Sequence, residues 1–214
     1  MSYIVRPKKS LGQHFLIDLN IAQAIADTLD NYKNTPILEV GPGMGVLTQY
    51  LLSKGHDLTD VELDHESIEY LQENFPELKG HILEEDFLKL DLSKLFSGNF
   101  CVIGNYPYNI SSQIFFKVLE YKDHIPCCSG MIQKEVAERM AAPPGSKTYG
   151  ILSVLLQAWY EIEYLFTVPE HVFNPPPKVI SAVIKMTRNQ VRQLGCNEPL
   201  FKRIVKTAFN QRRK

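Results

Sequence analysis

Short apolar runs alternate with amphipathic segments along most of this chain. Five runs are bounded by polar or turn-forming residues, as buried strands are: 36–40, 57–63, 81–83, 100–104 and 128–132. Four segments carry apolar residues at helical spacing, at 46–52, 66–75, 110–119 and 135–140. An earlier helix is predicted to begin after Asp18, whose side chain is suited to cap it. Strands that alternate with helices predict an α/β fold with a doubly wound, mainly parallel sheet.

The pattern changes toward the C-terminus. A helix at 149–159 is followed by two predicted strands, 162–168 and 181–186, with no helical segment between them. Because parallel neighbours need a long crossover connection, we expect an antiparallel strand at this end of the chain. A final helix is predicted at 198–209. Its apolar face is predicted to carry Leu200, Ile204, Val205 and Ala208.

Composition limits the classes of protein to which the chain can belong. With 214 residues, 44% of them hydrophobic and 22% charged, it suits one domain, or one domain with a small appendage. These fractions exclude a disordered, collagen-like or coiled-coil protein. The four cysteines form no C-x-x-C pair, which favours a reduced, cytoplasmic protein without a zinc site or other metal. No apolar stretch is long enough to span a bilayer and no secretory signal follows the basic start, so we expect no membrane contact.

The overall charge of −1 conceals an uneven distribution. Residues 175–214 hold ten basic residues and a single acid, Glu198, so this segment carries +9 and residues 1–174 carry −10. A basic end on an acidic body is a footprint of polyanion binding, although a solvated charged end is the commoner cause of such runs. Charge alone therefore makes nucleic acid a candidate partner and establishes no more than that.

The unusual residues of the chain follow the predicted strands. In a doubly wound sheet, ligands bind beyond the carboxyl ends of the strands. Gly41 and Gly43 lie in a turn directly after the first strand, and Glu62 lies on the second, 21 residues beyond Gly41. An acid at about this distance from a glycine turn binds the ribose hydroxyls of a nucleoside. A solvated glutamate at a strand end is the alternative, but the two features together favour a nucleoside site.

Asp86 follows the third strand and helps to separate the possible nucleoside ligands. Its carboxylate is placed to accept a hydrogen bond from an adenine amino group, and a turn cap explains the residue alone equally well. The turn at 41–45 has the spacing G-x-G-x-G and lacks the G-x-G-x-x-G form with which a helix N-terminus holds a pyrophosphate. An adenosine joined to an amino acid, without phosphates, suits these residues better. S-adenosylmethionine is such a ligand.

The tetrapeptide Asn-Tyr-Pro-Tyr follows the fourth strand, at 105–108. The exocyclic amine of adenine is a poor nucleophile because its lone pair is delocalised into the ring. Two acceptors, the carboxamide oxygen of Asn105 and the main-chain carbonyl of Tyr106, would draw that nitrogen toward tetrahedral geometry. Pro107 fixes the direction of the chain, and Tyr108 offers a ring on which a flipped base can stack. An ordinary Asn-x-Pro turn at a strand end would explain the tetrapeptide taken alone.

Nine stretches, in order over nearly the whole chain, give the sequence a resemblance to a known family. They are KSLGQHFL at 9–16, LEVGPGMG at 38–45, VELD at 61–64, ED at 85–86, GNYPYNISS at 104–112, QKEVA at 133–137, PGSKTYG at 144–150, FNPPPKV at 173–179 and FNQRRK at 209–214. Each stretch is short, but the ordered set is specific. The chain resembles the ribosomal RNA adenine N6,N6-dimethyltransferases, in particular those that act on the bacterial small subunit.

The resemblance implies a Rossmann-like S-adenosylmethionine-dependent methyltransferase fold. This fold has a seven-stranded, mostly parallel sheet with one antiparallel strand and helices on both faces. The cofactor-binding residues that it implies are Gln13, His14, Leu16, Gly41, Gly43, Glu62, Asp86 and Asn105. The catalytic set is Asn105, Tyr106, Pro107 and Tyr108. The substrate-binding set is Tyr108 and Phe173, which would sandwich the target adenine, with the basic residues Lys147, Lys178, Arg212 and Arg213.

The chain departs from the family pattern in three respects. Tyr106 stands where relatives usually have an aliphatic residue, and its bulk bears on the room for a second methyl group. His14 stands where many relatives have asparagine. Family members also continue beyond the position of Lys214. We therefore expect residues 1–187 to form the catalytic domain and residues 188–214 to be the basic start of a helical C-terminal domain.

The function expected from this resemblance is S-adenosylmethionine-dependent dimethylation of two adjacent adenines near the 3′ end of 16S rRNA, in the precursor of the small ribosomal subunit. We expect a cytoplasmic monomer. One alternative is a 23S rRNA adenine N6-methyltransferase of the macrolide-resistance type, and another is a noncatalytic RNA-binding or ribosome-assembly factor on the same fold. The complete set at 105–108, with Glu62 and Asp86, disfavours the noncatalytic alternative. A glutamine N5-methyltransferase or a DNA adenine methylase would carry a second proline in place of Tyr106.

Overall fold

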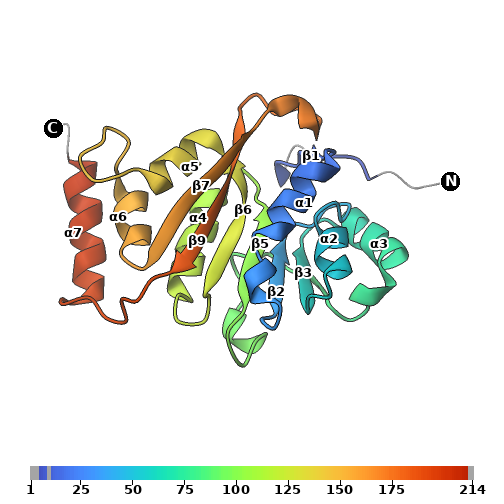
Figure 1. Cartoon of the computed structure of the whole chain (residues 1–214), viewed down its shortest axis with the longest axis horizontal. Helices are drawn as coiled ribbons and strands as arrows, with labels where there is room; N and C mark the ends of the chain where they lie inside the picture. Colours follow the sequence, from blue (N-terminus) through green and yellow to red (C-terminus); the bar gives the residue numbers. More distant parts are fainter. Residues whose placement is uncertain (1–4, 9–10, 212–214) are drawn as a thin grey trace.

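The central sheet has seven strands in the order β4-β3-β2-β5-β6-β9-β7 (Figure 1). The computed structural model describes residues 5–8 and 11–211. The strands of this sheet are β2 (Ile37–Val40), β3 (Leu58–Glu62), β4 (Ile82–Glu84), β5 (Cys101–Asn105), β6 (Cys127–Gln133), β7 (Tyr160–Val168) and β9 (Ser181–Arg188). β9 runs antiparallel to both of its neighbours, and the remaining neighbours are parallel. The predicted α/β fold, with one antiparallel strand in a mostly parallel sheet, is confirmed.

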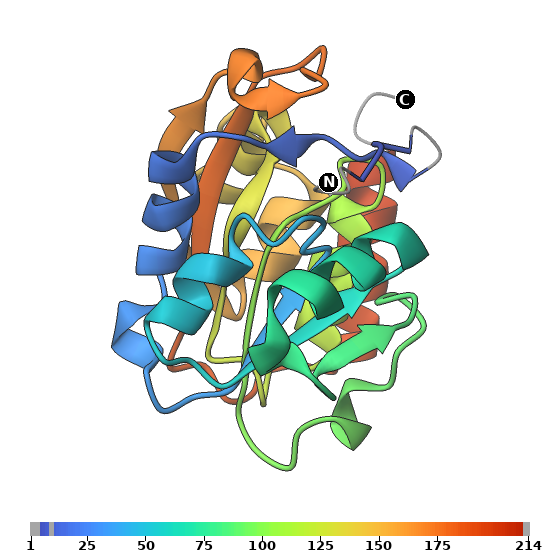
Figure 2. The same ribbon diagram turned by 90° about the vertical axis from the view of Figure 1, so that its right-hand side faces the viewer.

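Helices cover both faces of the sheet. They are α1 (Leu19–Asp27), α2 (Thr48–Ser53), α3 (His65–Asn74), α4 (Ser111–Glu120), α5 (Lys134–Ala141), α6 (Ile151–Gln157) and α7 (Glu198–Asn210). Short 3-10 turns lie at Asp30–Tyr32, Pro76–Leu78, Leu92–Lys94 and Glu170–Val172. Figure 2 shows α1 on one side of the sheet and α4 and α7 on the other.

The core explains why the central strands are uninterrupted apolar runs. Both faces of β2 are covered, so that Ile37 packs in the cluster that holds α1 and α2, and Leu38 packs in the cluster that holds α4. A parallel strand that is buried on both faces needs apolar residues at successive positions rather than at alternate ones. Glu39 is the exception on β2, because this buried carboxyl interrupts the apolar run.

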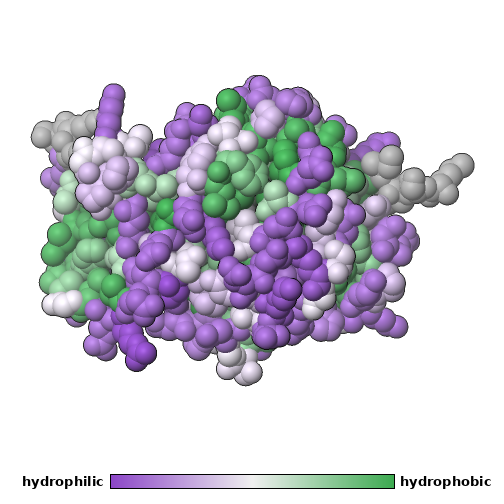
Figure 3. All heavy atoms as spheres, in the orientation of Figure 1, coloured by the Kyte–Doolittle hydropathy of each residue, from purple (hydrophilic) through white to green (hydrophobic). Residues whose placement is uncertain are grey.

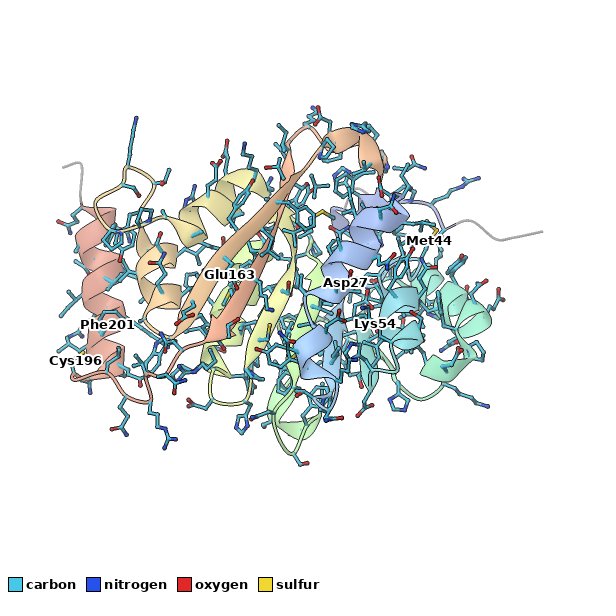
Figure 4. All side chains as sticks on the ribbon, in the orientation of Figure 1. Asp27, Met44, Lys54, Glu163, Cys196 and Phe201 are labelled. Atoms are coloured by element: carbon cyan, nitrogen blue, oxygen red, sulfur yellow. The ribbon has the colours of Figure 1, made fainter. Side chains whose placement is uncertain are left out.

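The first helix begins where the sequence predicts. The Oδ1 atom of Asp18 accepts hydrogen bonds from the N–H groups of Asn20 (2.9 Å) and Ile21 (3.1 Å), which satisfies two free donors at the start of α1. At the other end of α1, Asp27 contacts Lys54 at 2.7 Å (Figure 4). This ion pair connects α1 to the end of α2.

A second, two-stranded sheet was not predicted. It consists of β1 (Phe15–Leu16) and β8 (Phe173–Asn174), which pair antiparallel with Leu16 opposite Phe173. The N–H group of Ile17 extends the contact by donating to the carbonyl of Val172 at 2.9 Å. This small sheet joins the segment before α1 to the loop before β9, so two segments far apart in sequence lie side by side.

The predicted packing face of the last helix is correct for Val205 and wrong for Leu200, Ile204 and Ala208, which are exposed. α7 packs against the core through Phe201, Val205 and Phe209, which recur every four residues, and Figure 4 labels Phe201 on this helix. Leu200 and Ile204 are 43% and 56% exposed. Two stripes of apolar residues at helical spacing lie next to each other on α7, and the stripe with the larger aromatic side chains is the one that packs. Figure 3 shows apolar surface at this end of the molecule.

Membrane-spanning helices and metal-binding clusters are both absent from the described residues, 5–8 and 11–211. No helix in these ranges combines the length and the apolar composition needed to cross a bilayer. In the same ranges, no three His, Cys, Asp or Glu side chains are grouped so as to hold a metal ion. The four cysteines are free thiols, of which only Cys196 is exposed.

Candidate functional site

A cavity of about 290 Å³ opens at the carboxyl ends of β2, β3 and β5. Its walls come from the turns that follow these strands, from the turn that follows β4 and from the segment before α1. Every residue predicted to bind the cofactor or to act in catalysis lines it: Gln13, His14, Leu16, Gly41, Gly43, Glu62, Asp86, Asn105, Tyr106, Pro107 and Tyr108. Parallel strands bring them together because their carboxyl ends lie at one edge of the sheet.

Glu62 is the last residue of β3 and connects two walls of the cavity. Its Oε2 accepts the N–H of Gly43 at 3.1 Å, and its Oε1 accepts the N–H groups of Leu63 (2.8 Å) and Asp64 (2.9 Å). Burial raises the pKa of Glu62, and these three main-chain donors act in the opposite direction. Because each carboxylate oxygen has two lone pairs, Oε2 retains the capacity to accept one further donor.

The glycine turn beside Glu62 leaves main chain open to the cavity. Gly41 has a φ of +68°, a left-handed conformation that glycine adopts without strain. A Cβ atom at this position would meet no atom within 4 Å, so the space in front of the main chain is free. A ligand can therefore lie directly against the backbone at Gly41.

Two more carboxyl groups are buried behind Glu62. Glu39 accepts a hydrogen bond from the Thr48 hydroxyl at 2.8 Å, and burial raises its pKa to about 8. Asp60 lies opposite Glu39 in the register of β2 and β3 and is fully buried. Neither oxygen of Asp60 has a hydrogen-bond partner among the described residues. Burial, and then the charges of Glu39 and Glu62, raise the pKa of Asp60 well above its usual range.

We expect Asp60→Ala to raise the free energy of unfolding at neutral pH by about 1–3 kcal/mol, because the variant no longer buries an unbonded carboxyl. In the wild type, the pKa of Asp60 in the folded state lies above its unfolded value of 3.8. The folded state therefore binds more protons than the unfolded state. Stability therefore falls as the pH rises above about 4, toward the folded-state pKa, and this slope is smaller in the variant.

Urea unfolding at about pH 5 and about pH 8 measures both effects of the Asp60 substitution. Asp57→Ala, which removes an exposed acid three residues earlier, is the matched control and should change stability little. A wild type that is more stable than Asp60→Ala at both pH values would contradict this account.

Gln13 and Asp64 hold the segment before α1 against the start of α3. The Gln13 amide donates to Asp64 at 3.1 Å, and the Lys8 ammonium donates to the other oxygen of Asp64 and contacts Glu66 at 3.0 Å. Burial raises the pKa of Asp64, but hydrogen bonds from Lys8, Gln13 and Ser67 outweigh it and lower that pKa below its usual value. An amide N–H of Gln13 is therefore hydrogen-bonded within the protein. Asp64 was not predicted as a site residue, although it ends the VELD stretch.

The turn at 105–108 presents two oxygen atoms that are free to accept hydrogen bonds. The Asn105 amide Nδ2–H donates to the carbonyl of His14 at 3.1 Å, which leaves its Oδ1 as the acceptor end of the carboxamide. The N–H of Tyr106 donates to Met131 at 3.0 Å and so holds the turn to β6. Among the described residues, neither Oδ1 of Asn105 nor the carbonyl of Tyr106 accepts a hydrogen bond.

The side chain of Tyr106 lies in the core. The residue is 1% exposed, its hydroxyl donates to the carbonyl of Ser129 at 2.7 Å, and its ring meets Phe115 edge to face at 5.5 Å. Burial raises the pKa of this phenol well above its usual range. The bulk of Tyr106 is therefore accommodated on the core side of the turn, while its carbonyl belongs to the wall of the cavity.

His14 and Tyr108 form a stacked pair at the mouth of the cavity. Their ring centroids are 5.7 Å apart with an interplanar angle of 21°. The Nδ1 of His14 lies 2.8 Å from the carbonyl oxygen of Pro175, and the Tyr108 hydroxyl contacts the hydroxyl of Ser181. The imidazole therefore links the segment before α1 to the loop that precedes β9, in addition to its predicted place in the cavity.

Asp86 caps the turn that follows β4. Its Oδ1 accepts the N–H of Leu88 at 3.0 Å, and the Lys89 ammonium lies 3.5 Å from its Oδ2. The turn-cap role considered for this residue is thus present in the structure. Because Asp86 also lines the cavity, capping holds its carboxylate in place beside the space for a ligand.

Three of the predicted substrate-binding residues, Phe173, Lys147 and Lys178, lie outside the wall of the cavity. Phe173 is 2% exposed and packs in the second core cluster opposite Leu16, so stacking of a base on it requires β8 to open. Lys147 is exposed in the loop between α5 and α6, and Lys178 is exposed just before β9. Arg212 and Arg213 lie outside the described residues.

Comparison with known proteins gives consistent matches over the whole chain. The sequence model of the family described as ribosomal RNA adenine dimethylase matches residues 4–214. The protein named ribosomal RNA small subunit methyltransferase A from Parabacteroides distasonis is 77% identical, over 99% of this chain and 79% of that protein. The protein of the same name from Phocaeicola vulgatus is 71% identical, over 99% of this chain and 76% of that protein.

Two solved structures are also similar. A dimethyladenosine transferase from Plasmodium falciparum has a TM-score of 0.77 and 26% identity, covering 94% of this chain and 72% of that one. The 23S rRNA methyltransferase ErmE has a TM-score of 0.76 and 28% identity, covering 92% of this chain and 79% of that one. The mixed seven-stranded sheet is thus the sheet of a methyltransferase fold.

Proposed function

Because this chain belongs to the ribosomal RNA adenine dimethylase family, we propose that it dimethylates the N6 amines of two adjacent adenines near the 3′ end of 16S rRNA. It is an rRNA adenine methyltransferase, and S-adenosylmethionine is its cofactor. The observation that carries the proposal is the single cavity in which Glu62, Asp86 and the turn at 105–108 lie together.

The residues of the cavity fit an adenosine that carries an amino acid. Glu62 retains a lone pair for a ribose hydroxyl, and Asp86 holds a carboxylate at the wall for the adenine amine. The wall between them includes the apolar side chains of Val61, Phe87 and Leu88, which suit the faces of a base. When bound, S-adenosylmethionine supplies a methyl group on a positively charged sulfur.

The turn at 105–108 supports the reaction by accepting hydrogen bonds from the target amine. Oδ1 of Asn105 and the carbonyl oxygen of Tyr106 are the two acceptors, and both belong to groups held by main-chain contacts. An amine that donates both of its N–H groups in this way gives up conjugation with the ring, so its lone pair becomes available. The rate then comes from positioning and from preorganised acceptors, with no requirement for a strong base.

Glu62→Ala is expected to weaken binding of S-adenosylhomocysteine at least about tenfold, because the variant lacks the acceptor for a ribose hydroxyl. Titration calorimetry measures the dissociation constant, and a thermal melt checks that the fold is retained. Glu84→Ala is the matched control, because Glu84 pairs with Glu62 in the register of β3 and β4 but lies exposed on the neighbouring strand. Equal affinity in wild type and Glu62→Ala would remove Glu62 from the site.

The choice of 16S rRNA rests on the names of the two small-subunit relatives, and the 23S enzyme among the solved structures supplies the alternative. Transfer of tritiated methyl groups to unmethylated small subunits, large subunits and naked 16S and 23S rRNA separates the two. We expect label in small subunits and little in large subunits. Label confined to 23S rRNA would favour the alternative, and no transfer to any RNA would contradict the activity itself.

We further infer that the protein acts as a monomer in the cytoplasm, on the precursor of the small subunit. The predicted cofactor-binding and catalytic residues of one chain gather around one cavity, which supports a monomer. The exposed Lys147 and Lys178 and the basic segment 175–214 are proposed to contact the RNA backbone. Light scattering of the purified protein measures its mass in solution, and a dimer would contradict the monomer.

A further inference from the structure

Lys117 is a buried cation that has no part in the proposed reaction. It lies on α4, is 7% exposed, and its ammonium donates to the main-chain carbonyls of Leu88 (3.0 Å) and Leu90. The same ammonium lies 5.6 Å from the centre of the Phe87 ring. Burial lowers the pKa of Lys117, as it does for an ammonium taken out of water. The hydrogen-bond acceptors of this ammonium are main-chain carbonyls rather than carboxylates. We therefore expect Lys117 to stabilise the segment that carries those carbonyls.

That segment, 86–90, is one wall of the cofactor cavity. Asp86, Phe87 and Leu88 all line the cavity. The turn is closed from within, because the carbonyl of Asp86 accepts the N–H groups of Lys89 (2.9 Å) and Leu90 (3.1 Å). These bonds define the shape of the turn but do not attach it to the rest of the fold. Phe87 packs in the core cluster that holds α4, and the hydrogen bonds from Lys117 attach the main chain of the turn at Leu88 and Leu90 to that helix.

The same helix also contacts a second part of the cavity wall, the turn at 105–108. α4 starts at Ser111, directly after the turn at 105–110, and the Ser111 hydroxyl donates to the carbonyl of Tyr108 at 3.2 Å. Phe115 on α4 packs against the ring of Tyr106. One rigid helix therefore contacts the catalytic turn through its first half and the 86–90 turn through Lys117.

We infer that Lys117 is a positioning residue, an inference that rests on the proposed cofactor site. Lys117 holds the 86–90 segment at a fixed distance from the 105–108 turn, and the adenosine end of the cofactor requires this distance. It touches neither cofactor nor substrate. Its ammonium acts through the carbonyls of Leu88 and Leu90, and its loss changes the width of the cavity at Asp86.

Lys117→Met tests the inference, because methionine keeps an unbranched apolar side chain of similar length and removes all three donors. We expect the dissociation constant for S-adenosylhomocysteine and the KM for S-adenosylmethionine to rise at least about tenfold. We expect kcat at saturating cofactor to stay within about threefold of wild type, because Asn105 and Tyr106 are untouched. Lys94→Met is the control, since Lys94 is exposed and its ammonium lies 3.6 Å from the Asp91 carboxylate, away from the cavity wall.

Each outcome of the Lys117 experiment is decisive. A variant with a lowered melting temperature but wild-type cofactor affinity and KM would show that Lys117 only stabilises the fold, and would overturn the inference. If Lys117→Met does not melt cooperatively, Lys117→Leu, which also removes every donor, replaces it, and wild-type affinity there would also overturn the inference. If the wild type itself fails to bind S-adenosylhomocysteine, the proposed function fails instead.

Discussion

Asn105→Ala should slow methyl transfer at saturating cofactor by at least about 100-fold. In the proposed reaction, the carboxamide oxygen accepts a hydrogen bond from an amine whose lone pair becomes available only as the reaction proceeds, so its effect falls on the transition state. The orientation of the carboxamide is set by the Nδ2–H bond to the carbonyl of His14, which leaves Oδ1 for the substrate. Alanine retains the path of the main chain and removes only this acceptor and its anchor.

Single-turnover kinetics with unmethylated small subunits measures the effect of the Asn105 substitution on the rate. Cofactor affinity should change much less than the rate, because binding of the adenosine end depends on Glu62 and Asp86. Asn74→Ala is the control: Asn74 is exposed at the end of α3, and its amide donates to the carbonyl of Tyr70 in the same helix. A rate for Asn105→Ala within a few-fold of wild type would exclude the proposed role.

Gly130→Ala should destabilise the protein by at least about 3 kcal/mol. Gly130 lies in β6 with a φ of +145°, a conformation that side-chain-bearing residues rarely adopt. A Cβ atom there would lie 2.1 Å from the carbonyl oxygen of Gly104 and 2.7 Å from a ring carbon of Tyr106. Gly104 is the register partner of Gly130 on β5, and the Tyr106 ring is enclosed in the core. Displacement of either the Gly104 carbonyl or the Tyr106 ring is therefore energetically unfavourable.

The same substitution connects stability to activity. Displacement of Tyr106 would shift its main-chain carbonyl and the adjacent Asn105, so the fraction of Gly130→Ala that stays folded should have lowered activity. Urea unfolding measures the stability, with Gly98→Ala as the control because a Cβ atom at Gly98 meets no atom within 4 Å. A Gly130→Ala variant as stable and active as the wild type would show that Gly130 is not needed to make room for Tyr106.

The core of the site could be predicted from the sequence because its residues follow strands. Gly41, Glu62, Asp86 and Asn105 each lie at or just after the carboxyl end of a predicted strand, and parallel pairing places those ends at one edge. No long-range contact had to be known. The buried runs of β2 and β5 are also local patterns, which is why the strands themselves were predictable.

The contacts that hold the site together could not be predicted in the same way. β1 and β8 have two residues each, too few for any periodicity, and their pairing joins positions more than 150 residues apart. The partners of Gln13 and His14 are likewise set by folding rather than by local sequence, as are the two carbonyls that Lys117 holds. On α7, two apolar stripes satisfy the same helical spacing, so only packing chooses between them.

Nucleoside analysis of rRNA after reaction with the purified protein tests the central claim most directly. Unmethylated small subunits are incubated with S-adenosylmethionine and either wild type or Asn105→Ala, and the digested 16S rRNA is examined by mass spectrometry. We predict N6,N6-dimethyladenosine at two adjacent positions near the 3′ end with wild type, and almost none with the variant. Absence of dimethyladenosine with folded, cofactor-binding wild type, or methylation of a different base, would contradict the assignment of the cavity as the site of adenine dimethylation.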